Sequence, residues 1–155
     1  MNKVSAFSIV LSEIKFILVE IIKLGGKPYL VGGTVRDLVL GVPTKDIDIE
    51  VHGLKIEDLE KCLKKFGKVK LVGKKFGVLR LYGFDIDWSL PRKDTKGRKP
   101  VVEIDPNMKI EEACKRRDLT INSMAIELNN DFFEDLKNNK EPKIIDPYIF
   151  KLLSS

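Results

Sequence analysis

The chain has 155 residues, of which 43% are hydrophobic and 33% are charged. This length suits one domain with a sizeable core, and the composition excludes a disordered chain and a membrane-embedded one. The net charge of +5 fits a polyanionic partner, although a mild excess of lysine is also common on ordinary soluble proteins. The two cysteines, Cys62 and Cys114, have neither metal-ligand spacing nor a disulfide framework, so we expect a reduced, cytoplasmic setting.

Residues 1–26 predict an amphipathic helix that packs on the rest of the domain. Apolar side chains recur there at helical spacing, at Phe7, Val10, Leu11, Ile14, Ile17, Leu18 and Ile21. Charged residues interrupt this pattern too early for a membrane span, at Glu13, Lys15, Glu20 and Lys23, so no membrane partner is expected. Gly25 and Gly26 supply the end of the helix.

The next segment predicts a strand, a helix and a second strand. Pro28–Val31 is a short apolar run that ends at Gly32-Gly33, and a helix is expected from Thr34 to Gly41. In residues 45–51, KDIDIEV, acidic and apolar residues alternate. Successive side chains of a strand point to opposite faces, so this strand has one apolar face and one acidic face. Alternation of this kind also describes an ordinary half-exposed strand.

The remaining chain predicts a helix over 56–66, strands over 68–72, 76–83 and 84–90, and a loop over 91–100. A helix is expected through much of 109–128, and a short strand in the tail after residue 142. Strands and helices alternate and then strands cluster, which indicates an α+β fold with a mixed β-sheet of about five strands flanked by helices. We place the main domain at 27–148 and a separate terminal segment at 149–155.

Two strands carry the acidic pattern. Asp46 and Asp48 share a face of the first, and Asp85 and Asp87 share a face of the second, FDIDWSL. If the sheet brings the strands together, their carboxylates converge into hard oxygen ligands that suit Mg²⁺. A pair of such ions can activate an attacking hydroxyl and stabilise a leaving pyrophosphate. From these residues alone, a nucleotidyl-transfer site and a solvated strand face are equally open.

Gly32-Gly33 stands where the buried strand meets a helix. Without a Cβ in the way, backbone N–H groups can approach a phosphate, and the helix N-terminus favours negative charge. Arg36 lies about one turn into the helix and is placed to clamp a phosphate oxygen. A plain strand-to-helix turn explains the two glycines equally well.

The run YLVGGTVRDLVLGVPTKDIDIEV, residues 29–51, strongly resembles the signature of the tRNA nucleotidyltransferase (CCA-adding enzyme)/poly(A) polymerase family, in its bacterial-type, class II branch. The run EEACKRRDLTINSMAI, residues 111–126, resembles the second signature of that family. Together with FGVLRLYGFDIDWSLPRKD and IIDPY, these runs cover about residues 28–148 in the family's order. The resemblance implies the head, or catalytic, domain with the fold of the DNA polymerase β-like nucleotidyltransferase superfamily.

By this resemblance, Asp46 and Asp48 are the catalytic pair of a two-metal Mg²⁺ site. Asp87 matches the third metal-binding carboxylate, with Asp85 on the same face as the alternative. The resemblance gives Glu50 no metal role, so it is expected to be solvated or to support the pair from outside. The nucleotide-binding positions are matched by Gly32, Gly33, Arg36, Arg117, Asp118 and Asn122, of which Asp118 is tied to the ribose 2′-hydroxyl.

Four further features have plain interpretations beside functional ones. The basic residues of Arg92–Lys99 fit either a solvated loop or the family's mobile loop, where they would meet an RNA backbone. Residues 117 and 118, apart from the family, read as an exposed ion pair. His52 is expected in a turn rather than as a ligand, and Trp88 in the core.

The resemblance implies Mg²⁺-dependent, template-independent transfer of AMP or CMP from ATP or CTP to an RNA 3′-hydroxyl, with tRNA 3′-CCA addition as the first expectation. One alternative is a head-only nucleotide- and RNA-binding module, or a poly(A)-polymerase-like subunit that is inactive without a neck domain. Another is a small nucleotidyltransferase with a non-RNA acceptor.

The end of the sequence departs from the family. The neck motif Glu-Asp-x-x-Arg does not follow the IDP run, and an apolar strip stands there instead, at Ile149, Phe150, Leu152 and Leu153. We expect either a head-domain fragment or a minimal protein completed by a partner segment or a second copy. In both cases the strip is expected to be an interface.

Overall fold

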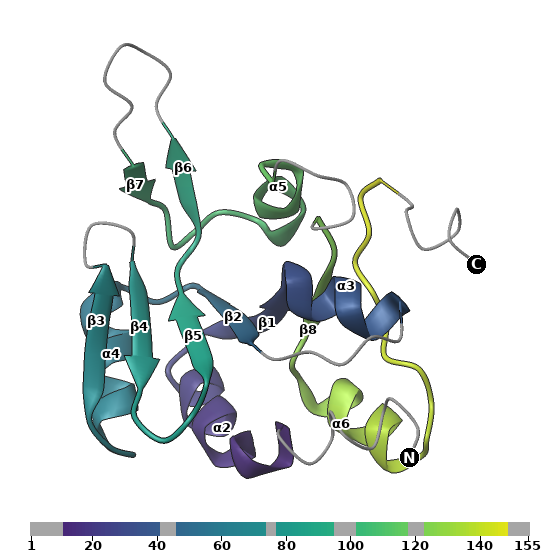
Figure 1. Ribbon diagram of the computed structural model, residues 1–155, viewed down its shortest axis with the longest axis horizontal. Helices are drawn as coiled ribbons and strands as arrows, with labels where there is room; N and C mark the ends of the chain where they lie inside the picture. The colour runs from purple at the N-terminus through teal and green to yellow at the C-terminus, as the bar shows by residue number, and fades with distance from the viewer. Residues whose placement is uncertain (1–10, 41–45, 74–76, 95–101, 118–122, 149–155) are drawn as a thin grey trace.

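The computed structural model describes residues 11–40, 46–73, 77–94, 102–117 and 123–148. The helices are α2 (Lys15–Lys23), α3 (Gly33–Leu40), α4 (Ile56–Lys64), α5 (Ile110–Lys115) and α6 (Asn130–Lys137). The strands are β1 (Lys27–Val31), β2 (Ile47–His52), β3 (Val69–Gly73), β4 (Val78–Leu81), β5 (Ile86–Ser89), β6 (Arg92–Asp94), β7 (Val102–Ile104) and β8 (Ala125–Glu127). Figure 1 shows their arrangement, with the β6–β7 arm projecting away from the main sheet.

Six strands form one mixed sheet in the order β3-β4-β5-β2-β1-β8, and β6 pairs with β7 alone. The α+β class is confirmed, with six strands in the main sheet where about five were expected. Strands β2 and β5 run parallel, and the other pairs are antiparallel. A parallel pair needs a crossover, which α4 and the β3–β4 hairpin provide. The two acidic strands are therefore neighbours, as the sequence pattern required for the carboxylates to converge.

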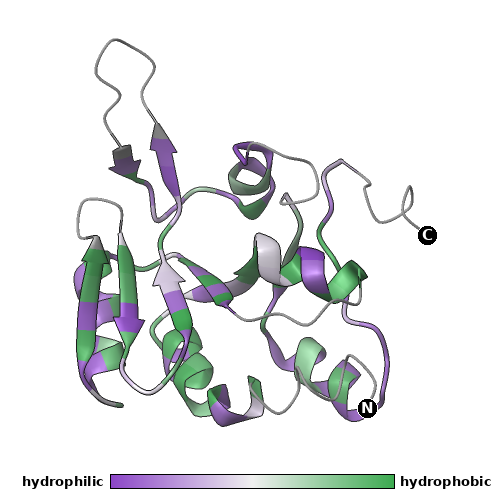
Figure 2. Cartoon of the chain, in the orientation of Figure 1, coloured by the Kyte–Doolittle hydropathy of each residue, from purple (hydrophilic) through white to green (hydrophobic). Residues whose placement is uncertain are grey.

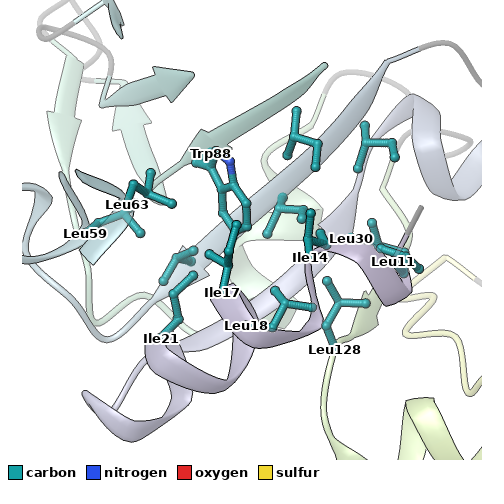
Figure 3. Packing of buried hydrophobic residues seen from close by; sticks show 14 of the residues in the cluster. Leu11, Ile14, Ile17, Leu18, Ile21, Leu30, Leu59, Leu63, Trp88 and Leu128 are labelled. Carbon is teal, nitrogen blue, oxygen red and sulfur yellow. The ribbon is translucent and has the colours of Figure 1, made fainter. Parts of the chain in front are cut away.

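Helices α2 and α4 cover the apolar face of the sheet. Ile17, Leu18 and Ile21 of α2 are fully buried, as is Trp88 of β5, and Figure 3 shows Trp88 pointing toward Ile17. The predicted core position of Trp88 is confirmed. Burying each such aliphatic side chain contributes about 1.5–3 kcal/mol, so this face supplies much of the stability. The apolar half of each acidic strand is fixed here, which forces the carboxylates to the opposite face.

Helix α5 covers part of that opposite face. Its buried residues Ile110 and Cys114 pack with Tyr29, Val31 and Ala125 of β1 and β8. Burial raises the pKa of the Cys114 thiol to about 11, so the thiol stays protonated at neutral pH. Both cysteines are free and buried. The polar face of β2 thus runs from an acidic end, near the start of the strand, to a covered end beneath α5.

Two predicted elements are corrected by the structure. The long helix over 109–128 is wrong beyond α5, because Ala125–Glu127 forms β8 and pairs with β1. Pairing with β1 buries both Ala125 and Ile126 in the sheet. This burial depends on a distant strand, so local helical periodicity cannot predict it. The loop over 91–100 is wrong at Arg92–Asp94, which forms β6 of the arm; Figure 2 shows this strand as hydrophilic.

Several predictions fall outside the described residues: the helix start at Phe7 and Val10, the loop residues Lys96, Arg98 and Lys99, and the strip at 149–155. The expected interface and self-association through that strip stay predictions, as do the domain boundaries. Within the described ranges, no helix is both long and apolar enough to cross a bilayer. Helix α6, which the sequence patterns above did not predict, is capped by the Asn129 side chain, whose Oδ1 accepts from the Phe132 N–H at 3.0 Å.

Candidate active site

The turn between β1 and α3 brings a cation and a carboxylate together. Gly32 has φ +64, a left-handed backbone conformation that is strained for any residue with a Cβ. A Cβ at this position would lie 3.2 Å from Nη1 of Arg117 and 3.6 Å from Oδ2 of Asp48. Glycine therefore meets two needs at once: it allows the backbone to turn, and it leaves room where these two side chains approach the chain.

Gly33 leaves room for Arg36, the predicted phosphate-binding arginine of α3. A Cβ on Gly33 would lie 3.0 Å from Nη2 of Arg36, because the guanidinium folds back over the start of α3. Nε of Arg36 also donates to Oδ1 of Asp37 at 3.1 Å. The structure thus places Arg36 beside the glycine pair, at the helix end where backbone dipoles favour an anion.

Thr34 connects this turn to the first acidic strand. Its hydroxyl accepts from the Asp48 N–H at 2.9 Å and donates to the Asp46 carbonyl at 3.1 Å, and the residue is only 1% exposed. A buried hydroxyl that makes both bonds fixes the backbone between the two aspartates relative to α3. Sequence patterns did not reveal this role; the only signal is a small polar residue directly after Gly32-Gly33.

Asp48 of β2 and Asp87 of β5 are direct partners in the parallel register. Asp46 precedes β2 by one residue and points to the same face by alternation. Asp87 is engaged by a residue that the sequence patterns also missed: both Nε and Nη2 of Arg80, on β4, lie 2.9 Å from its Oδ1. Arg80 is the register partner of Asp87, so its position follows from strand pairing that no local pattern predicts.

The acidic cluster is electrostatically loaded. Burial raises the pKa of Asp48 above its usual value; the charges of Asp87 and Asp46 raise it further, while Arg117 opposes them. As the side chains stand, no three acidic, histidine or cysteine groups in the described ranges are close enough to hold a metal. Oδ1 of Asp87 lies 2.9 Å from Nη2 of Arg80. Partly buried carboxylates that repel one another nevertheless suit a divalent cation, which would neutralise their charge.

Glu50 was expected either to be solvated or to support the aspartate pair from outside, and the structure rules out the first. It is only 7% exposed, so it is not a solvated carboxylate. It lies two residues after Asp48 on the same face, and its Oε2 accepts from Nη2 of Arg117 at 3.2 Å. His52 is not a turn residue but the last residue of β2, 5% exposed, and it contacts Glu50.

Other predicted residues divide as follows. Asp85 is exposed and lies outside β5, so the register favours Asp87 as the partner of Asp48. Asp118 and Asn122 lie outside the described residues, and their nucleotide roles stay predictions. The nearby cavity of about 480 Å³ lies at the opposite end of β1 from Gly32, where Lys27 and His52 are paired. It is therefore separate from the carboxylate cluster.

The chain matches a known protein family and several of its members in sequence. Residues 28–141 match the family model of the poly A polymerase head domain. The chain is 37% identical over 120 residues to a CCA-adding enzyme of Buchnera aphidicola, covering 74% of this chain and 28% of that protein. It is 34% identical over 126 residues to a multifunctional CCA protein of Xylella fastidiosa, covering 79% and 26%.

Solved structures give the same result. The crystal structure of the Bacillus stearothermophilus CCA-adding enzyme in complex with CTP aligns with a TM-score of 0.65 and 30% identity, over 92% of this chain and 31% of that one. A tRNA nucleotidyltransferase complexed with a primer tRNA and an incoming ATP analog aligns with a TM-score of 0.59 and 26% identity, over 89% and 36%. The chain thus spans about a third or less of each of these proteins. Its sequence and its fold place it in the poly A polymerase head domain family.

Proposed function

We propose that the chain transfers AMP or CMP from ATP or CTP to an RNA 3′-hydroxyl, and that the acceptor is the 3′ end of tRNA. The observation that carries this proposal is the register of β2 and β5, which sets Asp48 opposite Asp87 beside the Gly32 turn. In the reaction the RNA 3′-oxygen bonds to the α-phosphorus, pyrophosphate leaves, and the hydroxyl proton is released. This chemistry concentrates negative charge at the phosphates, where the chain offers cations and backbone N–H groups.

Each residue has a separate task in this proposal. Arg36 and Arg117 bind the triphosphate from the two sides of the Gly32-Gly33 turn. Asp46, Asp48 and Asp87 would hold two Mg²⁺ ions, which when bound supply charge neutralisation and an activated hydroxyl. Thr34 holds Asp46 and Asp48 in place. Arg80 keeps Asp87 oriented and must share that carboxylate with the metal.

The choice of nucleotide and acceptor rests on relatives. One solved neighbour is in complex with CTP, and another with a primer tRNA and an ATP analog. The family model itself is described as a poly A polymerase head domain, so base selection is the finer part of the proposal. A protein that acts on tRNA fits the cytoplasmic setting expected from two unpaired cysteines.

The test is incorporation of labelled ATP and CTP, supplied separately with Mg²⁺, into tRNA that lacks its terminal nucleotides. The matched control is the Asp46→Ala protein. We expect label on the tRNA, lost in the control. Label on protein but not on RNA would favour a non-RNA acceptor, and Mg²⁺-dependent nucleotide binding without any transfer would favour a binding module that needs further chain.

A further inference from the structure

A chain of buried polar groups runs along the covered half of β2. Nδ1 of His52 lies 2.6 Å from the Met108 carbonyl oxygen, and its Nε2 lies 2.7 Å from Oε1 of Glu50. The other carboxylate oxygen, Oε2, accepts from Arg117 at 3.2 Å. The Tyr29 ring packs edge-on against the His52 ring with centroids 5.0 Å apart, which limits rotation of the imidazole.

The chemistry of these partners fixes the direction of the bonds. The Met108 carbonyl can only accept, so Nδ1 of His52 donates to it. The other ring nitrogen, Nε2, faces Oε1 of Glu50 at 2.7 Å. Each Glu50 oxygen therefore has its own partner, one on β2 and one beyond α5. A buried carboxylate with both oxygens engaged has little freedom to rotate.

This network fastens α5 to β2 at both of its ends. Met108 precedes the first residue of α5 by two positions, and Arg117 follows the last by two. The Arg117 N–H donates to the Cys114 carbonyl at 3.2 Å, which holds the backbone of residue 117 at the helix end. In the segment before α5, close to Met108, the Pro106 carbonyl accepts from the Gly53 N–H at 2.7 Å.

The result is a definite position for one guanidinium. Arg117 is held by Glu50 through Nη2, while Nη1 lies 3.2 Å from the place that a Gly32 Cβ would occupy. Its side chain remains 31% exposed, so the group is anchored and still accessible. An arginine that binds phosphate gains most when its rotamers are restricted before the ligand arrives.

We propose that Glu50 is a positioning residue that sets the Arg117 guanidinium for the nucleotide triphosphate, with His52 as its support. This inference rests on the proposed function, because it assigns Arg117 to the triphosphate. Along one face of β2, Asp48 would then bind the metal and Glu50 would position Arg117. His52 connects Glu50 to the Met108 carbonyl in the segment before α5.

The test measures dissociation constants of Mg·CTP and Mg·ATP by equilibrium dialysis on the full chain, with a melting curve for every variant. Glu50→Gln keeps the length and hydrogen-bonding shape of the side chain but removes the charge that holds Arg117. We expect about tenfold weaker binding, the loss of one charge-assisted hydrogen bond. Glu127→Gln is the matched control: it changes a half-buried glutamate of the same sheet face, on β8, that bonds Tyr29 rather than Arg117. It should bind nucleotide as the wild type does.

The decisive comparison repeats Glu50→Gln in an Arg117→Ala background. If Glu50 acts through Arg117, the second substitution has no further effect on nucleotide affinity. Equal losses in both backgrounds would mean that Glu50 acts through the general fold, and would overturn the inference. So would wild-type affinity in Glu50→Gln.

His52→Gln provides a second route should Glu50→Gln fail to fold. It retains polar atoms at the same place, and we expect a smaller loss that also disappears in the Arg117→Ala background; a loss of equal size in both backgrounds would overturn the inference. The proposed function fails separately: a wild type that binds neither nucleotide refutes it, and the inference with it. A wild type that binds, beside a Glu50→Gln protein that binds equally well, refutes the inference alone.

Discussion

Replacing Gly32 with alanine should damage the candidate site in two separable ways. The backbone at φ +64 costs an L-residue about 1–2 kcal/mol. For a chain of this length, each kcal/mol lowers the melting temperature by about 2–4 °C, so a drop of about 2–8 °C is expected. The new Cβ would also lie 3.2 Å from Nη1 of Arg117. The end of a flexible side chain can yield a few tenths of an ångström at small cost in stability, but the guanidinium then leaves its place, and CTP should bind more weakly.

Two other glycines separate these effects. Gly25 has φ +93 with nothing within 4 Å of its Cβ position, so Gly25→Ala should lower the melting temperature and leave CTP affinity unchanged. Gly33 has no left-handed strain, but its Cβ would lie 3.0 Å from Arg36, so Gly33→Ala should weaken CTP binding without a comparable loss of stability. The assay pairs thermal melting with CTP dialysis for all three variants. Wild-type CTP affinity in Gly32→Ala would refute the assignment of this turn to the triphosphate.

Three further predictions concern the carboxylates. Asp48→Asn should be more stable than the wild type at neutral pH in urea denaturation and inactive in transfer, because burial and Asp87 raise the Asp48 pKa. A raised pKa means that the folded state binds the proton more tightly than the unfolded state, so wild-type stability falls as the pH rises from 3.8 to the raised pKa. The stability advantage of Asp48→Asn should therefore shrink as the pH falls toward 3.8. An advantage that stays constant with pH would contradict this reasoning. Thr34→Val should cost about 1–3 kcal/mol by melting, through an unpaired buried Asp48 N–H, while Thr34→Ser should retain most stability; equal losses would show that the hydroxyl is not responsible. Arg80→Gln should change stability little, since the pair is partly exposed, and should tighten Mg²⁺ binding in a calorimetric titration, because the guanidinium no longer competes with the metal for Asp87. Weaker Mg²⁺ binding would mean that the orienting effect of Arg80 on Asp87 outweighs this competition.

The acidic strands were predictable because a strand has a simple period. Alternation in KDIDIEV and FDIDWSL separates the carboxylates from Ile49 and Trp88, and the structure buries these two completely. That the sheet brings these two strands side by side was a condition stated from sequence, and the structure meets it by pairing Asp48 with Asp87 in a parallel register. The Gly32 turn was also foreseeable, since a glycine pair between a buried strand and a helix indicates an unusual backbone.

The rest depends on contacts between distant segments. Ala125 reads as part of a helix locally and becomes a strand because β1 offers it a partner. Glu50 looks like one more solvated acid, yet it is buried and pairs with Arg117, which follows α5 and is 67 residues away in sequence. His52 is the only histidine, and its role appears only when the Met108 carbonyl lies 2.6 Å from its ring. Local periodicity carries no information on such pairings.

The central claim is that Asp46, Asp48 and Asp87 form one Mg²⁺-dependent transfer site. Asp85 offers an internal control, since it lies two residues from Asp87 but is exposed and outside the strand register. The most direct measurement is therefore the rate of CMP incorporation into tRNA that lacks its terminal nucleotides, for the wild type, Asp87→Asn and Asp85→Asn across a range of Mg²⁺ concentrations. We predict that Asp87→Asn loses transfer at every Mg²⁺ concentration while Asp85→Asn retains it. Loss in Asp85→Asn with activity kept in Asp87→Asn would contradict the assigned site.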